Sequence, residues 1–388
     1  MPYDLPDVVS SADAEQDLLL GIVVAIQANF YQVQLQHLSN SPDATDIDLD
    51  PHSTETVPIG SAALVDRPPQ LLCTRRSRLM KTGQKVMVGD CVVIEEPDWQ
   101  GQRGAIADIL PRRSQLDRPP VANADQILLV FALAEPELDA HQLSRFLVKA
   151  ESTGLDVVLG LSKSDLVSLE KQAEWCDRLQ NWGYSPIFIS VRQQQGLEQL
   201  FSHLGHKITI VSGPSGVGKS SLINALIPQA QLRVGEVSGK LARGRHTTRH
   251  VELFELPSGG LLADTPGFNQ PELTCLPEEL PFYFPEIRDR LAEADCQFSD
   301  CLHREEPNCA VKGAWERYRD YLEFLEDAIA YKQTIERQAN PEATFKRKTA
   351  RKGQEQLEPK LATQKYRRPS RRTQQQTLMS DNHELEEL

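Results

Sequence analysis

The feature that most restricts the fold is the segment at residues 213–220, which reads Gly-Pro-Ser-Gly-Val-Gly-Lys-Ser. It matches the pattern GxxxxGK[ST], follows an apolar run at 207–211 and precedes a helix-like run at 221–226. In that context the glycines let backbone N–H groups turn toward a phosphate, and the helix start adds a favourable dipole. The pattern therefore predicts a phosphate-binding loop (P-loop) on a parallel α/β sheet.

Individual residues of this loop are expected to bind different parts of the nucleotide. Lys219 would reach the β- and γ-phosphates of a nucleotide, and Ser220 would hold Mg²⁺. The predicted phosphate-binding residues are Gly213, Pro214, Ser215, Gly216, Val217, Gly218, Lys219, Ser220 and Ser221.

Two segments further along the chain predict nucleotide-sensing switches. The sequence Asp-Thr-Pro-Gly at 264–267 ends a strand-like run. Asp264 can hold Mg²⁺ through water there, and the Gly267 amide can contact a γ-phosphate. Between the two motifs, Thr247 and Thr248 are both candidates to complete the Mg²⁺ shell.

The candidate catalytic residue is His246. Phe268 stands just after the Asp-Thr-Pro-Gly motif, where Ras-like proteins carry a Gln that orients the attacking water. An apolar ring cannot orient water by hydrogen bonding, so another group must do so, and His246 lies close to the candidate threonines. The alternative is that His246 only occupies the loop.

A base-reading motif precedes the P-loop. Ser162-Lys163-Ser-Asp165 follows an apolar run at 155–161 and resembles the NKxD guanine motif, with Ser in place of Asn. The Asp165 carboxylate can accept two hydrogen bonds that guanine supplies and adenine does not. Ser190 ends the next strand-like run, where GTPases place a second base-side element. We expect guanine specificity, with an ATPase as the alternative.

The motif order is the reverse of that in ordinary GTPases, because the base-reading residues come before the P-loop. A parallel sheet tolerates this if its original termini are joined and new ones are opened elsewhere. The switch at Asp264 then leads directly into the C-terminal part of the chain. The nucleotide state can therefore act mechanically on that part.

Four potential metal ligands lie close together after the switch: Cys296, Cys301, His303 and Cys309. Three thiolates and an imidazole at this spacing predict one closed, structural Cys₃His zinc site without an open catalytic position. The seven cysteines are odd in number and otherwise scattered, which argues against a disulfide framework. Unligated buried thiols are the alternative.

The remaining patterns predict a chain of several domains. After an N-terminal extension at 1–17, strand-like runs predict a β-barrel over 18–117, interrupted by an acidic insertion at about 37–58. Alternating apolar strands and helices predict a parallel sheet covered on both faces over 118–272. The barrel runs are 19–26, 30–35, 71–74, 86–88, 91–95 and 104–110, and the sheet strands are 126–132, 155–161, 186–190 and 207–211.

The C-terminal part is predicted to be helical over 273–339 and disordered over 340–388. An apolar stripe at helical spacing is expected to pack on the neighbouring domain: Trp315, Tyr318, Leu322, Leu325 and Ile329.

Charge and hydropathy limit the classes of partner that this chain can bind. The net charge is -13, but the segment at 346–372 is strongly basic, and Arg75, Arg76, Arg78 and Lys81 form a basic group on the predicted barrel. Either group can contact RNA or be an ordinary solvated surface. No apolar run approaches the roughly 20 residues needed to span a bilayer, and no signal peptide is recognisable. We expect a cytoplasmic monomer without a membrane contact.

Together these features resemble the ribosome small-subunit-dependent GTPase A family (YjeQ/RsgA type) from about residue 18 to about 338. The resemblance implies an OB-fold barrel, low intrinsic GTP hydrolysis, stimulation by the small ribosomal subunit and its rRNA, and late maturation of that subunit. A regulatory nucleotide sensor, with hydrolysis only as a timer, is the competing hypothesis. The matching segments are 118–125, 213–220, 244–248, 264–267 and the four predicted metal ligands.

Overall fold

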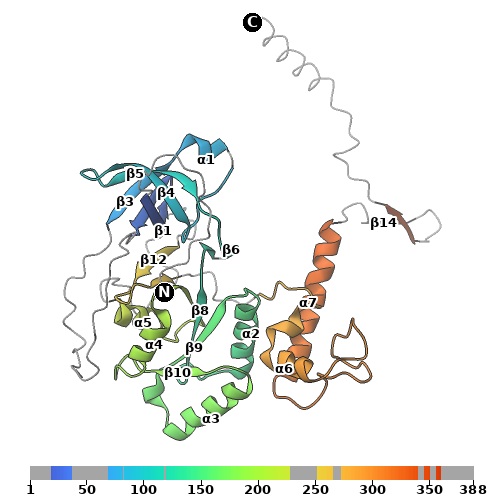
Figure 1. Cartoon of the computed structure of the whole chain (residues 1–388). Coiled ribbons are helices and arrows are strands. Elements are labelled where there is room, and N and C mark those ends of the chain that lie inside the picture. The colour runs from blue at the N-terminus through green and yellow to red at the C-terminus, as the bar shows by residue number, and fades with distance from the viewer. Residues whose placement is uncertain are drawn as a thin grey trace, which may run out of the picture.

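The computed structural model describes residues 19–36, 69–81, 83–117, 119–227, 251–264, 272–339, 345–349 and 355–359. Figure 1 shows a barrel above an α/β domain, with a helical domain beside the latter. This arrangement confirms the predicted fold class. A barrel is followed by a circularly permuted α/β GTPase domain and then by a mostly helical C-terminal domain. The acidic insertion and the N-terminal extension lie outside the described residues.

The N-terminal barrel closes because β1 (Leu19–Gln27) pairs with both β2 (Phe30–Leu35) and β4 (Cys91–Asp98). The ring is completed by β3 (Gln70–Arg75) and β5 (Arg103–Ile109), which pair in parallel. Side chains of β2 and β3 alternate between the interior and the outer surface, whereas β1 is buried on both faces because Ile22 and Val24 pack in the core of the next domain. The interior is filled by apolar side chains that include Val23, Val33, Leu71, Cys73, Val92 and Ile106.

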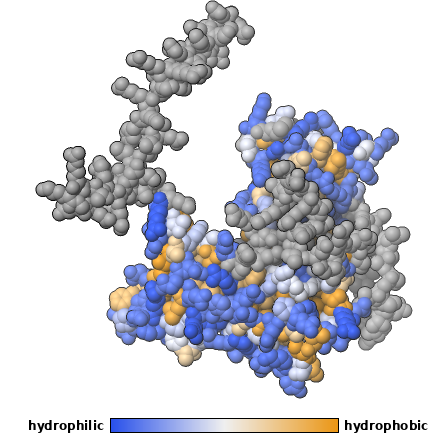
Figure 2. All heavy atoms as spheres, turned by 180° about the vertical axis from the view of Figure 1, so that it is seen from behind, coloured by the Kyte–Doolittle hydropathy of each residue, from blue (hydrophilic) through white to orange (hydrophobic). Residues whose placement is uncertain are grey.

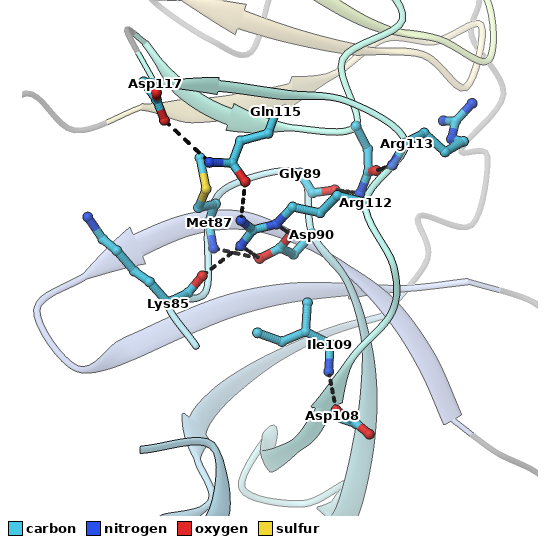
Figure 3. A network of polar contacts seen from close by, with 11 residues as sticks. Lys85, Met87, Gly89, Asp90, Asp108, Ile109, Arg112, Arg113, Gln115 and Asp117 are labelled. Carbon is cyan, nitrogen blue, oxygen red and sulfur yellow. Dashed lines mark hydrogen bonds and ion pairs between the residues drawn. The ribbon is translucent and has the colours of Figure 1, made fainter. Parts of the chain in front are cut away.

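The expectation of a strand at 86–88 was wrong, because only Val88 makes an isolated bridge, to Val121. The apolar run is buried, but the chain turns back there through Gly89 (φ 87°). The fully buried Asp90 carboxylate accepts from the Met87 N–H (2.7 Å) and from Arg112 Nε and Nη2 at 2.7 and 2.9 Å (Figure 3). Side-chain hydrogen bonds thus replace a strand ladder where the barrel meets the next domain.

The α/β domain contains five parallel strands in the order β10 (Pro186–Ile189), β9 (Asp156–Ser162), β8 (Gln126–Ala132), β11 (Ile208–Ser212) and β13 (Leu261–Asp264). An antiparallel strand, β12 (Glu252–Glu255), follows β13 at the edge. It also pairs with β1 through Glu252 and Ala25, so barrel and domain share one 11-stranded sheet.

Helices cover both faces of this sheet, as predicted. Apolar residues of α2 (Ala140–Glu151) and α3 (Leu169–Asn181) pack in one core, and those of α4 (Leu197–Leu204) and α5 (Lys219–Leu226) in another. A short 3₁₀ turn, η1 (Ser164–Leu166), joins β9 to α3, and a two-stranded ribbon of β6 (Gln115–Asp117) and β7 (Pro120–Ala122) leads from the barrel.

The C-terminal domain contains η4 (Leu280–Tyr283), α6 (Pro285–Glu293) and the long α7 (Tyr318–Ala339). Of the predicted apolar stripe, only Leu325 is fully buried; the most buried α7 side chains are Tyr321, Phe324, Leu325 and Ala328. This core also includes Val148 of α2, so α7 packs both within its own domain and on the neighbouring one.

Within the predicted tail, β14 (Phe345–Thr349) pairs with β15 (Glu355–Pro359), and the remainder lies outside the described residues. Among the described helices none is both long and apolar enough to cross a membrane. On the face seen in Figure 2, hydrophilic side chains predominate and hydrophobic ones form separate patches.

Candidate nucleotide-binding site and metal centre

The predicted P-loop connects the end of β11 to the start of α5. Gly213, Gly216 and Gly218 adopt positive φ angles of 140°, 84° and 95°. A Cβ at Gly213 would lie 2.0 Å from the carbonyl oxygen of Val130, so this position requires glycine. The loop therefore lies close against the end of β8. Its three glycines place no side chain between the loop backbone and a bound phosphate.

Lys219 is buried, with 6% of the residue exposed. Its Nζ donates to the carbonyl oxygens of Gly213 (2.7 Å) and Pro214 (2.6 Å). The ammonium group thus lies at the mouth of its own loop, where incoming phosphate oxygens can replace the carbonyl acceptors. Ser220 and Ser221 follow in the first turn of α5.

The base-side loop is tied to the P-loop by Lys163. This residue has a left-handed conformation (φ 55°) between β9 and η1. Its Nζ donates to the Gly216 carbonyl at 3.1 Å and also to the Glu135 carbonyl. Gly216 belongs to the P-loop and Glu135 to the turn after β8, so one ammonium group joins three segments.

Ser162 adds a second connection between the same loops. Its buried Oγ lies 2.5 Å from the Val217 carbonyl oxygen and 3.1 Å from the Phe131 carbonyl oxygen. A hydroxyl group has one hydrogen to donate, so it serves one of these carbonyls at a time. The short side chain at this position therefore holds the P-loop to the sheet from inside the domain.

Asp165 and Ser190 are brought together from two strand ends. Ser190 Oγ donates to Asp165 Oδ1 at 2.7 Å and accepts from the Gln193 N–H at 3.1 Å. Ser190 is fully buried, and its backbone exchanges two hydrogen bonds with Gln195. One carboxylate oxygen of Asp165 is therefore oriented by the protein.

The structure describes the switch residues only in part. Asp264 ends β13 and pairs in register with Val211 of β11, beside the P-loop, while its side chain lies outside the described residues. The predicted residues His246, Thr247, Thr248 and Gly267, together with Phe268, also lie outside them. Their roles stay predictions.

The four predicted metal ligands converge. The ligand atoms of Cys296, Cys301, His303 and Cys309 all lie within 4.8 Å of one another. His303 Nδ1 is 3.4 to 3.5 Å from each of the three sulfurs, and the sulfurs of Cys296 and Cys309 are 3.9 Å apart. Burial lowers the pKa of His303, which favours the neutral imidazole that binds metals. This group can hold a metal ion.

Neighbouring side chains position this loop. Glu306 accepts from the N–H groups of Leu302 (3.0 Å) and Arg304 (2.6 Å), and the Tyr318 hydroxyl donates to the His303 carbonyl at 2.9 Å. The Lys312 N–H donates to the sulfur of Cys309 at 3.3 Å. These contacts orient the ligands from outside the cluster.

One buried contact between the C-terminal domain and the α/β domain was not expected from the sequence. Arg317, 1% exposed, pairs with Glu286 and lies 4.8 Å from the ring centroids of both Trp182 and Phe284. Trp182 follows α3 of the α/β domain and Phe284 precedes α6. No local pattern marks Arg317, because its partners come from distant segments.

Comparisons with known proteins agree with this arrangement. A family model described as RsgA GTPase matches residues 109–274. The small ribosomal subunit biogenesis GTPase RsgA of Trichormus variabilis is 65% identical over 360 residues, which cover 93% of this chain and 96% of that protein. The protein of the same name from Microcystis aeruginosa is 57% identical, with 94% of each chain covered.

Two solved structures have the same architecture. The crystal structure of YjeQ from Thermotoga maritima is similar with a TM-score of 0.63 and 30% identity, covering 80% of this chain and 98% of that one. YloQ, described as a circularly permuted GTPase, has a TM-score of 0.61 and 29% identity, covering 82% and 98%.

Proposed function

The chain belongs to the RsgA GTPase family, and from this premise we propose that it hydrolyses GTP to GDP and phosphate during late maturation of the small ribosomal subunit. The observation that carries the proposal is the joining of base-side and phosphate-side loops, through hydrogen bonds from Ser162 and Lys163 to P-loop carbonyls. Its proposed ligands are GTP and GDP, and its proposed partner is the small subunit with its rRNA. The proposed state is a cytoplasmic monomer.

The proposed nucleotide contacts follow from these connections. Asp165, oriented by Ser190, would accept hydrogen bonds from guanine, and Lys219 would exchange its loop carbonyls for phosphate oxygens. Ser162 occupies the position where the NKxD motif has Asn, and its hydroxyl donates to carbonyl oxygens of the protein itself. Guanine selectivity would therefore rest mainly on the Asp165 carboxylate.

Mg²⁺ is the proposed companion of GTP, and it would neutralise charge on the phosphates. Ser220 and Asp264 are its proposed ligands, with Thr247 or Thr248 completing the shell. Support comes from the neighbouring strands β11 and β13, which bring the end of β13 beside the P-loop strand.

One structural Zn²⁺ is the proposed occupant of the Cys₃His group. Tetrahedral bonds of about 2.3 Å to sulfur and about 2.0 Å to nitrogen place the ligand atoms about 3.5 to 3.8 Å apart. The three distances from His303 Nδ1 to sulfur, 3.4 to 3.5 Å, and the 3.9 Å between the sulfurs of Cys296 and Cys309 are close to this shape, and all four ligand atoms lie within 4.8 Å of one another. Four protein ligands leave no open position, so the ion would hold the loop together without taking part in hydrolysis.

His246 is the proposed residue that orients the attacking water. We expect His246→Ala to bind GTP normally and to lose most subunit-stimulated turnover. His203→Ala, on the exposed side of α4, is the matched control. Full stimulated turnover by His246→Ala would remove this assignment and leave the rest of the proposal intact.

RNA contact is proposed for the basic group at residues 75–78 and Lys81 on the barrel, and for the basic segment at 346–372. Barrels of this type commonly bind oligonucleotides. Binding through such groups should weaken steeply as salt rises. Association that is insensitive to salt would count against both.

A nucleotide sensor, with hydrolysis as a timer, is the second candidate. It is favoured by direct contacts between the C-terminal domain and the α/β helices, such as Arg145 to Asp327 at 2.7 Å. Affinity for the small subunit, measured with GDP and with a non-hydrolysable GTP analogue, tests it. A large difference at unchanged turnover would favour the sensor.

The main test is GTP turnover with and without purified small ribosomal subunits, with ATP as the control nucleotide. We expect slow turnover by the free protein, strong stimulation by the subunits, and little use of ATP. Equal use of both nucleotides, or the absence of stimulation, would overturn the proposal.

A further inference from the structure

The hydroxyl group of Ser162 is enclosed between the sheet and the P-loop. Ser162 ends β9, and only 4% of the residue is exposed. Its Oγ lies 2.5 Å from the Val217 carbonyl oxygen and 3.1 Å from the Phe131 carbonyl oxygen. Val217 is itself buried, so water has little access to replace the hydroxyl at its carbonyl. The side chain of Ser162 is therefore committed to the protein.

The number of hydrogens on this side chain limits what it can contact. A serine hydroxyl has one hydrogen to donate, whereas the amide of the Asn in an NKxD motif has two. An amide at this position could donate to a protein carbonyl and to a ligand at the same time. The single hydrogen of Ser162 is already used on the Val217 or the Phe131 carbonyl, so it leaves no donor for a ligand.

The covalent structure of a guanine nucleotide decides which base atom would face Ser162. With the phosphates on the P-loop and the N1–H edge at Asp165, the five-membered ring faces the P-loop, because that ring carries the ribose. N7, a hydrogen-bond acceptor, belongs to the five-membered ring. Ser162 stands three residues before Asp165 and is bonded to Val217 of the P-loop. It is therefore the side chain of the motif on the N7 side of the base.

The opposite edge of the base would meet a carboxylate that is held in place. The fully buried Ser190 donates from Oγ to Asp165 Oδ1 at 2.7 Å, and the Gln193 N–H donates to the same Oγ at 3.1 Å. An ionised carboxylate only accepts hydrogen bonds, so Asp165 can serve the N1–H and the 2-amino group of guanine but not N7. The two side chains thus recognise one edge of the base and not the other.

We propose that Ser162 leaves N7 of the bound guanine without a contact, so that the protein accepts guanine nucleotides whose position 7 cannot accept a hydrogen bond. The substrate class is then defined by the N1–H and the 2-amino group at Asp165, and position 7 is open to replacement. Ser162 acts on specificity by holding the P-loop and withholding its only hydrogen from the base. The inference rests on the proposed function, because it takes guanine to lie at Asp165.

The test measures the affinity of the full-length protein for three diphosphates by competition with a fluorescent GDP analogue. They are GDP, 7-deaza-GDP, which has C–H in place of N7, and inosine diphosphate, which lacks the 2-amino group. We expect GDP and 7-deaza-GDP to bind within about twofold of each other, and inosine diphosphate to bind about tenfold more weakly, because a hydrogen bond to a charged acceptor is lost. A preference of about fivefold or more for GDP over 7-deaza-GDP would overturn the proposal.

Two substitutions assign the effect to Ser162. Ser162→Ala should weaken GDP and 7-deaza-GDP by the same factor, because the P-loop loses a bond while N7 loses nothing; a loss confined to GDP would overturn the proposal. Ser162→Asn supplies a second donor and should create a preference for GDP over 7-deaza-GDP of about 5- to 10-fold. An unchanged ratio in a folded Ser162→Asn protein would show that this position does not face N7, and would also overturn the assignment.

Failure of the proposed function would look different. A wild-type protein that binds ADP as tightly as GDP removes the premise that guanine lies at Asp165. A protein that prefers GDP to ADP but also requires N7 removes only the present inference. Ser164→Ala, two residues further along the same loop, is the matched control and should leave both affinities unchanged. Circular dichroism of each variant verifies that the fold is retained.

Discussion

The nucleotide site and the Cys₃His group are held in place by different means. The P-loop lies between a buried strand and a helix, and its neighbours Ser162 and Lys163 bond to its carbonyls. The metal ligands lie between α6 and α7, where residues 294–317 contain no helix or strand. One site is positioned by the sheet and its strand ends, whereas the other lies on a loop whose four candidate ligands would be joined by a shared ion.

The largest expected effect is on the metal side. We expect Cys301→Ser, or chelation, to release the metal and destabilise the loop at 294–317, because structural zinc binding is worth about 10–16 kcal/mol. Metal content and protection from proteolysis measure this, while GTP binding should persist. Cys176→Ser, on α3 and outside the group, is the matched control. A Cys301→Ser protein with full metal content would show that Cys301 is not a metal ligand.

The next effect concerns base recognition. Asp165→Asn should reduce the preference for GTP over ATP by about 100-fold, because a charged acceptor for guanine is lost. Binding of fluorescent GTP and ATP analogues measures the preference. Asp177→Asn, an exposed change on α3, should leave it unaltered. An unchanged preference in Asp165→Asn would favour the ATPase alternative.

A smaller effect tests the tie between the two loops. Ser162→Ala removes the hydroxyl that reaches Val217 and Phe131, and we expect GTP affinity to fall about 5- to 10-fold with the GTP/ATP ratio unchanged. Ser164→Ala is a close control, since the buried Ser164 hydroxyl has no hydrogen-bond partner among the residues that the structure describes. Equal losses in the two variants would show that the Ser162 contact does not hold the P-loop.

The smallest effect is a pH dependence where α2 meets α7. A hydrogen bond to Asp320 (2.9 Å), assisted by the charges of Asp320, Glu323 and Asp139, raises the pKa of His141, and desolvation opposes this. A raised folded pKa means that the stabilisation is complete below the unfolded pKa of about 6.5 and is lost as pH rises through the folded value. His141 is 43% exposed, so the effect should be under about 1 kcal/mol.

Thermal unfolding of wild type and His141→Ala at several pH values measures this contribution. The difference in melting temperature should shrink as pH rises through the folded pKa of His141. A difference that stays constant across the range would assign His141 to packing against Phe324, whose ring centroid is 5.3 Å away.

Sequence patterns predicted the structure correctly where the interacting residues are close together in the chain. The P-loop glycines, the Cys₃His spacing and the apolar strands of the sheet are readable because turns, ligand sets and strand periodicity involve neighbouring residues. The strand expected at 86–88 failed for the opposite reason. Its apolar residues do become buried, but Asp90 and Arg112 decide the local backbone, and Arg112 lies 22 residues further along the chain.

By itself the sequence determined the P-loop motif, an Asp at the place expected for base recognition and four side chains able to bind a metal, and the order in which they occur. Only the tertiary structure decided which carbonyls the Ser162 hydroxyl contacts and where Arg317 is buried. Each of these depends on partners from distant segments, whose approach is set by sheet register and domain packing. Local sequence patterns do not encode those distances.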